Sequence, residues 1–230
     1  MDLLPADTML DERDRGATVA LLPIGSFEQH GSHLPLTTDT LVASAVVAEL
    51  AAAYPVRRLP PVTISCSHEH AAWPGTVSIS ATTLAAIVRD VAASVHRVGV
   101  TSLVLVNGHG GNYVLGNVVQ EASLGPLRMA LFPGEPDWED ARAAAGLVTS
   151  AWSDMHAGEL ETSVLLHTHP HLVRPGFEHA DRLAEDRRHL LSRGLQAYTG
   201  SGVVGRPSLA SAEKGRGVLA SLVRSFADYL

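Results

Sequence analysis

Apolar positions along the chain follow two alternating patterns. Short runs rich in β-branched residues predict buried strands at 18–24, 61–65, 101–106 and 127–132. Longer stretches, in which apolar residues recur at helical spacing, predict helices at 40–54, 81–99, 112–123, 158–168 and 211–229. Because strands and helices alternate, we expect an α/β fold, with a mostly parallel central sheet and helices on both of its faces.

Two stretches are rich in turn-forming residues and predict loops. These are 133–140 and 170–207, the second interrupted by a charged helix near 180–194. The sequence shows no internal repeat, low-complexity tract or linker that would divide it. We therefore expect residues 1–230 to form a single domain, a length that can bury a sizeable core.

Composition and charge narrow the class of protein. Hydrophobic residues make up 46% of the chain and charged residues 18%, which is typical of a globular protein rather than a disordered one. The net charge is −7 and the basic residues are scattered, so we expect neither nucleic acid nor a membrane as a partner. The N-terminal sequence lacks a secretory pattern, and no apolar run reaches about 18 residues, so we expect a cytoplasmic protein. Cys66 is the only cysteine, which excludes an intrachain disulfide and a cysteine-based zinc cluster.

The first cluster of candidate ligands follows the strand at 18–24. Glu28 and His30 are two residues apart, so in an extended segment their side chains point to the same face. Asp39 can return to that point through the intervening turn. Carboxylate and imidazole ligands suit Zn²⁺, Mn²⁺ or Fe²⁺, and a shared aspartate can give one oxygen to each of two cations. Either carboxylate alone would be equally typical of a polar loop or a helix cap.

Two further clusters occupy comparable places. His109 lies in a glycine-rich bend after the strand at 101–106, and His156 and Glu161 lie at the start of the helix at 158–168. The bend lacks the spacing of a P-loop or a dinucleotide-binding turn. In open α/β sheets, ligands bind outside the carboxyl ends of the strands, so we expect these clusters to meet. The helix start has a second interpretation, because Glu159 could simply cap it.

Another histidine pair precedes a short proline–glycine turn. His68 and His70 stand just before WPGT (73–76), and either could line the wall of a pocket or be solvated.

Several motifs together resemble the creatininase (creatinine amidohydrolase) family. They are IGSFEQHGSHLPLTTD (24–39), WPGT (73–76), LVNGHGGN (105–112), HAGELETS (156–163) and VVGRPSLASAEKG (203–215). The resemblance covers the chain from about residue 18 to its C-terminus. It implies a three-layer αβα sandwich, a binuclear divalent-metal centre and a homo-oligomeric assembly, with hexamers among the known forms.

The resemblance also implies a role for each matching residue. Glu28 and His109 match ligands of one metal, His30 matches a ligand of the other, and Asp39 matches the carboxylate that bridges them. His156 matches the catalytic histidine of the family.

Three positions depart from creatininase itself. Gly111 stands where that enzyme has a glutamate ligand, Gly110 where it has an aromatic residue, and Met155 where it has a glutamate. Glu161 is our candidate for the missing carboxylate, both as a metal ligand and as a catalytic residue. These departures argue against creatinine as the substrate.

The sequence thus predicts an amidohydrolase with two divalent cations (Zn, Mn or Fe) and a small-molecule amide substrate. The cations would activate water to attack an amide carbonyl, and His156 would give a proton to the leaving nitrogen. Within the family, the substrate could be a creatinine-like lactam, the formamide of a ribosylaminopyrimidine intermediate, or a peptide of the mycofactocin-precursor kind. A phosphorylated substrate would favour basic residues at the pocket rim, such as Arg206 or Arg216.

Two alternatives belong to other classes. The departures at Gly111 and Met155 are compatible with a non-catalytic protein that binds metal or ligand on the same scaffold. A serine hydrolase would need a nucleophile elbow, and the sequence has no GxSxG motif.

Overall fold

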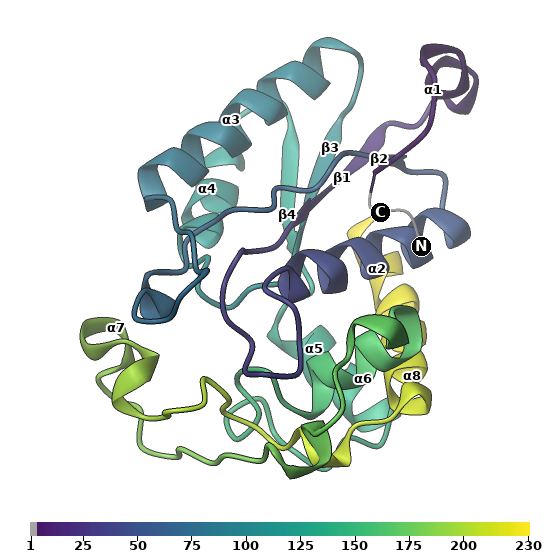
Figure 1. The fold of residues 1–230 in the computed structure, drawn as a ribbon. Coiled ribbons are helices and arrows are strands. Elements are labelled where there is room, and N and C mark those ends of the chain that lie inside the picture. Colours follow the sequence, from purple (N-terminus) through teal and green to yellow (C-terminus); the bar gives the residue numbers. More distant parts are fainter. Residues whose placement is uncertain (1–3) are drawn as a thin grey trace.

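A parallel sheet of four strands forms the centre of the structure (Figure 1), a computed structural model that describes residues 4–230. The strands lie in the order β2-β1-β3-β4 and are all parallel. Their bounds are β1 Val19–Ile24, β2 Arg57–Arg58, β3 Ser102–Asn107 and β4 Arg128–Phe132. Strands far apart in sequence are therefore neighbours, and the carboxyl ends of β1 and β3 lie at the same edge of the sheet.

Helices cover both faces of this sheet (Figure 1). On one face lie α2 Thr38–Ala53, α5 Glu135–Ala144, α6 Glu159–Thr168 and α8 Ala212–Ser225, and on the other α3 Ala81–Arg97 and α4 Val114–Ala122. Strand β3 serves both layers, because Leu103 and Leu105 are buried with α3 and α4 while Val104 and Val106 are buried with α2. The expected three-layer αβα sandwich is confirmed.

The first turn of α2 packs between the ends of β1 and β3. Glycine follows each strand at the point of closest approach. A Cβ on Gly25 would lie 2.3 Å from the Thr40 nitrogen, and a Cβ on Gly108 would lie 2.4 Å from the Asp39 carbonyl oxygen. Neither position has room for a side chain, so glycine lets both loops pack directly against the backbone of α2. Asp39, in the first turn of α2, therefore lies between the two loops.

The predicted strand at 61–65 is wrong. The strand in this region is β2, which ends at Arg58, and Val62 makes only an isolated parallel bridge to Ile24. The reason is the pair Pro60 and Pro61, which have no backbone N–H to donate to the neighbouring strand. Pairing along β1 resumes only where the Val62 nitrogen donates to the Pro23 carbonyl oxygen at 2.9 Å.

The predicted loop at 133–140 is also wrong, because most of it belongs to α5. Pro136 lies in the first turn of that helix, where its missing N–H costs nothing. Asp137 accepts a hydrogen bond from the Gly134 nitrogen at 2.8 Å and so caps the helix start. A proline that indicates a loop in sequence is here a helix-starting residue.

The charged helix predicted near 180–194 is reduced to a short α7, Leu190–Arg193. Tertiary contacts hold the preceding residues in an irregular conformation. Arg182 forms a β-bridge with Gly205, and the Arg187 guanidinium lies 4.4 Å from the centre of the Trp152 ring. The Arg187 side chain also donates to the Trp152 carbonyl oxygen at 2.6 Å. These contacts take precedence over the helical propensity of the segment.

The remaining predicted strands and helices are confirmed, with ends shifted by a few residues. Among residues 4–230, no helix combines the length and apolar character needed to cross a membrane.

Helices α6 and α8 are in close contact at Gly215, which gives a direct test of their packing. A Cβ at this position would lie 2.0 Å from the Ser163 carbonyl oxygen, a backbone atom that cannot move aside cheaply. We therefore expect Gly215→Ala to lower the free energy of unfolding by about 1–3 kcal/mol or more in urea titrations. Gly116 of α4 is the matched control, because a Cβ there meets open space. Gly116→Ala should raise the stability by about 0.5–1 kcal/mol, and equal stability of the two variants would contradict the packing.

Candidate metal centre

The carboxylate of Asp39 lies at the centre of the site. It belongs to the first turn of α2 and is buried. Its Oδ1 lies 3.0 Å from His30 Nε2, and its Oδ2 lies 3.0 Å from His109 Nδ1. The Ser26 hydroxyl donates to Oδ2 at 2.6 Å. Burial alone would raise the pKa of Asp39, but the neighbouring imidazoles of His30 and His109 outweigh it and hold the pKa well below its usual value. Asp39 is therefore ionised and presents one oxygen to each imidazole.

One group of possible ligands consists of Glu28, Asp39 and His109. An atom of each lies within 4.8 Å of the others, and the three residues are buried. His109 Nε2 donates to the Cys66 carbonyl oxygen at 2.8 Å, so Nδ1, which lies 3.0 Å from Asp39 Oδ2, is the ring nitrogen that could bind a cation. This is the set that the sequence assigned to the first metal.

A second group consists of His30, Asp39 and Glu161, on the other side of the shared aspartate. His30 Nδ1 donates to the Glu28 carbonyl oxygen at 3.0 Å, so Nε2 faces Asp39 and lies 3.9 Å from Glu161 Oε1. The other Glu161 oxygen accepts a hydrogen bond from the Ala157 nitrogen at 2.6 Å. Ala157 has a φ of 52°, a left-handed conformation that is uncommon outside glycine and that turns this N–H toward the carboxylate.

Electrostatics show that these residues fit divalent cations. Glu28 is fully buried, and its two oxygens face the imidazoles of His70 and His109 at 3.2 and 3.3 Å, without a hydrogen bond of ordinary geometry from the described residues. Burial raises the pKa of Glu28 to about 8 and that of Glu161 to about 7. A buried carboxylate is costly to ionise unless positive charge accompanies it, and a bound cation would supply that charge. Mixed carboxylate and imidazole donors are the ligands that Zn²⁺, Mn²⁺ and Fe²⁺ accept.

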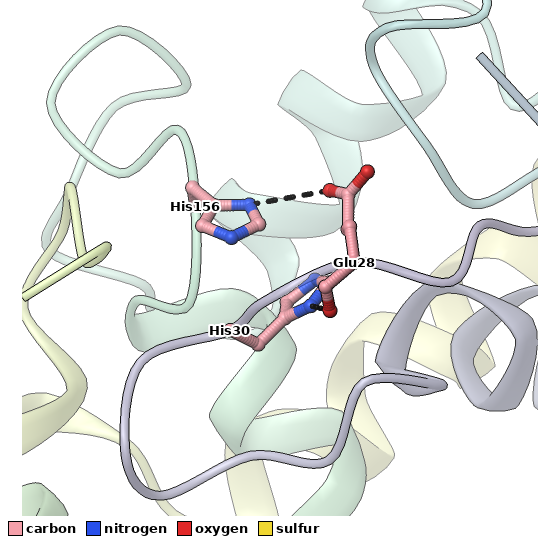
Figure 2. Close-up of side chains that lie close together, drawn as sticks. All are labelled: Glu28, His30 and His156. Atoms are coloured by element: carbon pink, nitrogen blue, oxygen red, sulfur yellow. Dashed lines mark hydrogen bonds and ion pairs between the residues drawn. The ribbon is translucent and has the colours of Figure 1, made fainter. Parts of the chain in front are cut away.

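His156 packs with tilted ring contacts against His30 and His70 and belongs to neither of the two groups above. Its ring centre lies 4.2 Å from that of His30 and 4.3 Å from that of His70. Its Nε2 donates to the Gln29 carbonyl oxygen at 2.6 Å, so the other ring nitrogen, Nδ1, faces Glu28 Oε1 at 3.8 Å (Figure 2). Burial lowers the pKa of His156 well below its usual value, which keeps the ring neutral. Glu28, His30 and His156 form a third group that could hold an ion.

Three buried or half-buried residues of the site, Gln29, Glu69 and His70, are not among the ligands and catalytic residues predicted from the sequence. Gln29 Nε2 donates to His70 Nδ1 at 2.9 Å, and His70 Nε2 in turn lies 3.2 Å from Glu28 Oε1. Glu69 Oε1 lies 3.6 Å from His109 Nε2. It also fills the room beside Gly111, where a Cβ would lie only 2.1 Å away. The signal for Glu69 and His70 is the HEH triplet (68–70) before WPGT. From the sequence, His70 is expected only as a possible residue of the pocket wall.

A cavity of about 760 Å³ opens beside the ligand groups. His109 and Glu161 line it, together with Trp138 and Met155. Its other charged residues are Glu135, Glu139, Arg142 and Asp154, so its lining is acidic. Among the described residues, His156 does not line this cavity, and neither do Arg206 and Arg216.

Two carboxylate–histidine groups that share an aspartate, each able to hold a metal ion, lie at the carboxyl edge of the parallel sheet of an α/β protein, where such folds bind their ligands. The chain belongs to the creatininase family, whose model, described as creatinine amidohydrolase, matches residues 7–230. The resemblance noted in the sequence is thereby confirmed.

Individual relatives support the same assignment. The mycofactocin precursor peptide peptidase of Mycobacterium ulcerans is 37% identical over 88% of this chain and 80% of its own. The creatinine amidohydrolase of Pseudomonas putida is 29% identical over 69% of this chain and 67% of its own. The solved structure named Creatininase Mn superposes with a TM-score of 0.83 over 100% of this chain and 97% of its own, at 23% identity, which shows the shared fold. The first two relatives are hydrolases, which supports a hydrolase activity for this chain.

The helix that carries Glu161 is fixed at its start by two buried carboxylates. Asp154 accepts hydrogen bonds from the nitrogens of Glu159 and Leu160 at 2.6 and 3.0 Å. Glu159 does not join any ligand group, and its carboxylate pairs with Lys214 of α8 and accepts from the Thr149 nitrogen at 2.9 Å. It therefore ties the start of α6 to α8 and to the preceding loop.

This ion pair predicts a pH dependence of stability. Burial would raise the pKa of Glu159, but the Lys214 ammonium and the Thr149 donors outweigh it and lower the pKa below the ordinary 4.5. A lowered pKa stabilises the folded chain above about pH 4.5, and this contribution is lost as the pH falls through the folded value. We expect Glu159→Gln to cost roughly 2–4 kcal/mol near neutral pH in urea titrations of the metal-free protein. The difference from the unmutated chain should shrink below about pH 4.5.

Glu213 of the neighbouring α8 turn supplies the control, because its side chain is 87% exposed. The free energy of unfolding of Glu213→Gln should equal that of the unmutated chain at every pH. A Glu159→Gln difference that stays constant with pH would contradict the role of the charge.

Proposed function

We propose that this chain is a two-metal amidohydrolase that cleaves the C–N bond of peptide amides. The observation that carries the proposal is the orientation of Asp39. One of its oxygens faces His30 and the other faces His109, and a separate carboxylate completes each side, Glu28 on one and Glu161 on the other. Such a shared carboxylate is how proteins hold two cations close together.

Each side chain of the site would have a distinct role. Divalent cations at the two groups would supply the Lewis-acid chemistry, lowering the pKa of water and polarising the amide carbonyl. Glu28 and His109 would hold one cation, His30 and Glu161 the other, with Asp39 between them. Ser26 keeps the bridging carboxylate in place through its hydrogen bond of 2.6 Å. Glu161 is the one of these carboxylates that also lines the cavity, so it is the one that a bound amide would meet.

His156 is the candidate proton carrier. Its Nε2 is held by the Gln29 carbonyl oxygen, so Nδ1 is the atom that can accept and return a proton. Because burial lowers the pKa of His156, the resting ring is neutral, so it would accept a proton before it donates one. We propose that this proton finally goes to the leaving nitrogen.

Three observations support peptides over other amides. The peptidase of Mycobacterium ulcerans is 37% identical to this chain and the creatinine amidohydrolase of Pseudomonas putida 29%. The cavity of about 760 Å³ lies in the range that holds ligands much larger than a single small ring. Its acidic lining disfavours a phosphorylated substrate, and Arg206 donates instead to Asp181 at 3.3 Å.

Metal content and hydrolysis test the proposal together. We expect about two ions per chain by mass spectrometry of the metals after reconstitution with Zn²⁺, Mn²⁺ or Fe²⁺. A chelator should abolish the hydrolysis of capped amides and short peptides, and adding metal back should restore it. Asp39→Asn should reduce the metal content and lower kcat/KM by at least about 10³-fold, since both ligand groups lose their shared oxygens.

Asp90→Asn is the matched control, because Asp90 is an exposed residue of α3. It should keep both the metal and the activity. Full activity of Asp39→Asn would contradict the proposal, and metal binding without any hydrolysis would favour the non-catalytic alternative.

A further inference from the structure

Two cavities lie along the loop that carries His109 and share Tyr113 in their walls. The cavity of about 760 Å³ is lined by His109, Gly110 and Tyr113. A second cavity, of about 410 Å³, is lined by Glu69, Gly111 and the same Tyr113. The loop from His109 to Tyr113 is therefore the border between them, and one end of that border is a candidate metal ligand.

The outer wall of the smaller cavity comes from a distant part of the chain. Leu191, Arg193 and Gln196 line it together with Glu69. Figure 1 shows α7 lying beside the turn at His68–His70, and the two elements are in contact. Leu191 is 78% exposed at this wall and offers apolar surface, as Trp138 does in the larger cavity.

Gly110 has no structural reason to be glycine. Its backbone is not in the left-handed region, and a Cβ built on it would meet no atom of the described chain within 4 Å. Its neighbours differ, because a Cβ on Gly108 would lie 2.4 Å from the Asp39 carbonyl oxygen and one on Gly111 2.1 Å from Glu69 Oε1. What glycine provides at position 110 is open space at the border of the two cavities.

We propose that a linear peptide lies across Gly110, with the residues on one side of the cleaved amide in the larger cavity and those on the other side in the smaller. The amide then crosses the border next to His109, where the ligand groups lie. Gly110 thus determines specificity, because any side chain there would narrow the passage between the cavities. This inference rests on the proposed function and adds to it the direction of the substrate and a residue that selects for its length.

Each cavity is of a size that holds a ligand fragment with several side-chain contacts. A substrate that occupies only one cavity makes no contacts in the other, so its binding does not depend on the passage between them. A peptide that extends on both sides of the cleaved amide gains contacts in both, so its kcat/KM should be higher. The preference for long over short substrates therefore measures the passage directly.

The experiment compares two substrates that share one cleaved bond. The bond is found by mass spectrometry of products from a panel of eight-residue peptides, and the short substrate is the same amide with both ends trimmed and capped. In the metal-loaded protein, we expect kcat/KM for the long peptide to exceed that for the short one by at least about 10-fold. Gly110→Tyr should lower this ratio by at least about 10-fold, and Gly110→Ala should lie between, because steric blocking grows with side-chain size.

Gly116→Tyr is the matched control, because Gly116 is exposed and borders neither cavity. It should keep the ratio of the unmutated chain. Metal content and thermal melting should be unchanged in Gly110→Tyr, which separates a blocked passage from a damaged site. A second readout is the affinity of the long peptide with its cleaved amide reduced to a methyleneamine, which Gly110→Tyr should weaken by at least about 10-fold.

The outcomes distinguish the two proposals. If the unmutated protein hydrolyses the capped amide as well as the long peptide, or if Gly110→Tyr leaves the ratio unchanged, the passage is refuted while the amidohydrolase survives. If the metal-loaded protein hydrolyses no amide, the proposed function itself fails, and the passage fails with it.

Discussion

The structure of the site depends on one carboxylate held between two imidazoles. Asp39 reaches this place because the first turn of α2 enters between the loops that follow β1 and β3, and each loop has a glycine where α2 passes. The same contact fixes the spacing of His30 and His109, each 3.0 Å from one oxygen of Asp39. A side chain at Gly25 or Gly108 would move the helix and the two ligand groups together, so packing and chemistry are coupled here.

Much of this arrangement can be predicted from the sequence, because it follows from the order of strands and helices along the chain. The alternation of apolar strands and helices predicts a parallel sheet, and parallel strands bring their carboxyl ends to one edge. Clusters that follow β1 and β3 must then meet, which is why Glu28, Asp39 and His109 lie within 4.8 Å of one another. Glu161 joins His30 and Asp39 for the same reason, since α6 packs on the face that α2 covers.

One difference from the expected fold is local, because Pro136 starts a helix whose Gly134 nitrogen is capped by Asp137 three residues on. The remaining differences depend on contacts that no local pattern carries. Residues 180–189 leave the helical conformation because Arg187 packs on Trp152. Glu69 enters the site because Gly111 leaves room for it, a relation between residues more than forty positions apart in sequence. Short-range propensity and periodicity contain no information about such pairs.

The distribution of charge explains why so many carboxylates are kept in the core beside an open cavity. Asp39 takes both imidazoles as partners, which lowers its pKa, while burial raises the pKa of Glu28 to about 8 and of Glu161 to about 7. The imidazoles therefore stabilise the ionised form of Asp39 more than that of Glu28 or Glu161, for which burial outweighs them. A purely structural site would replace such groups by apolar ones, since an unpaired buried charge destabilises a fold. Their retention beside the cavity is best explained by cations that complete the charge balance, at the edge where a substrate amide would meet them.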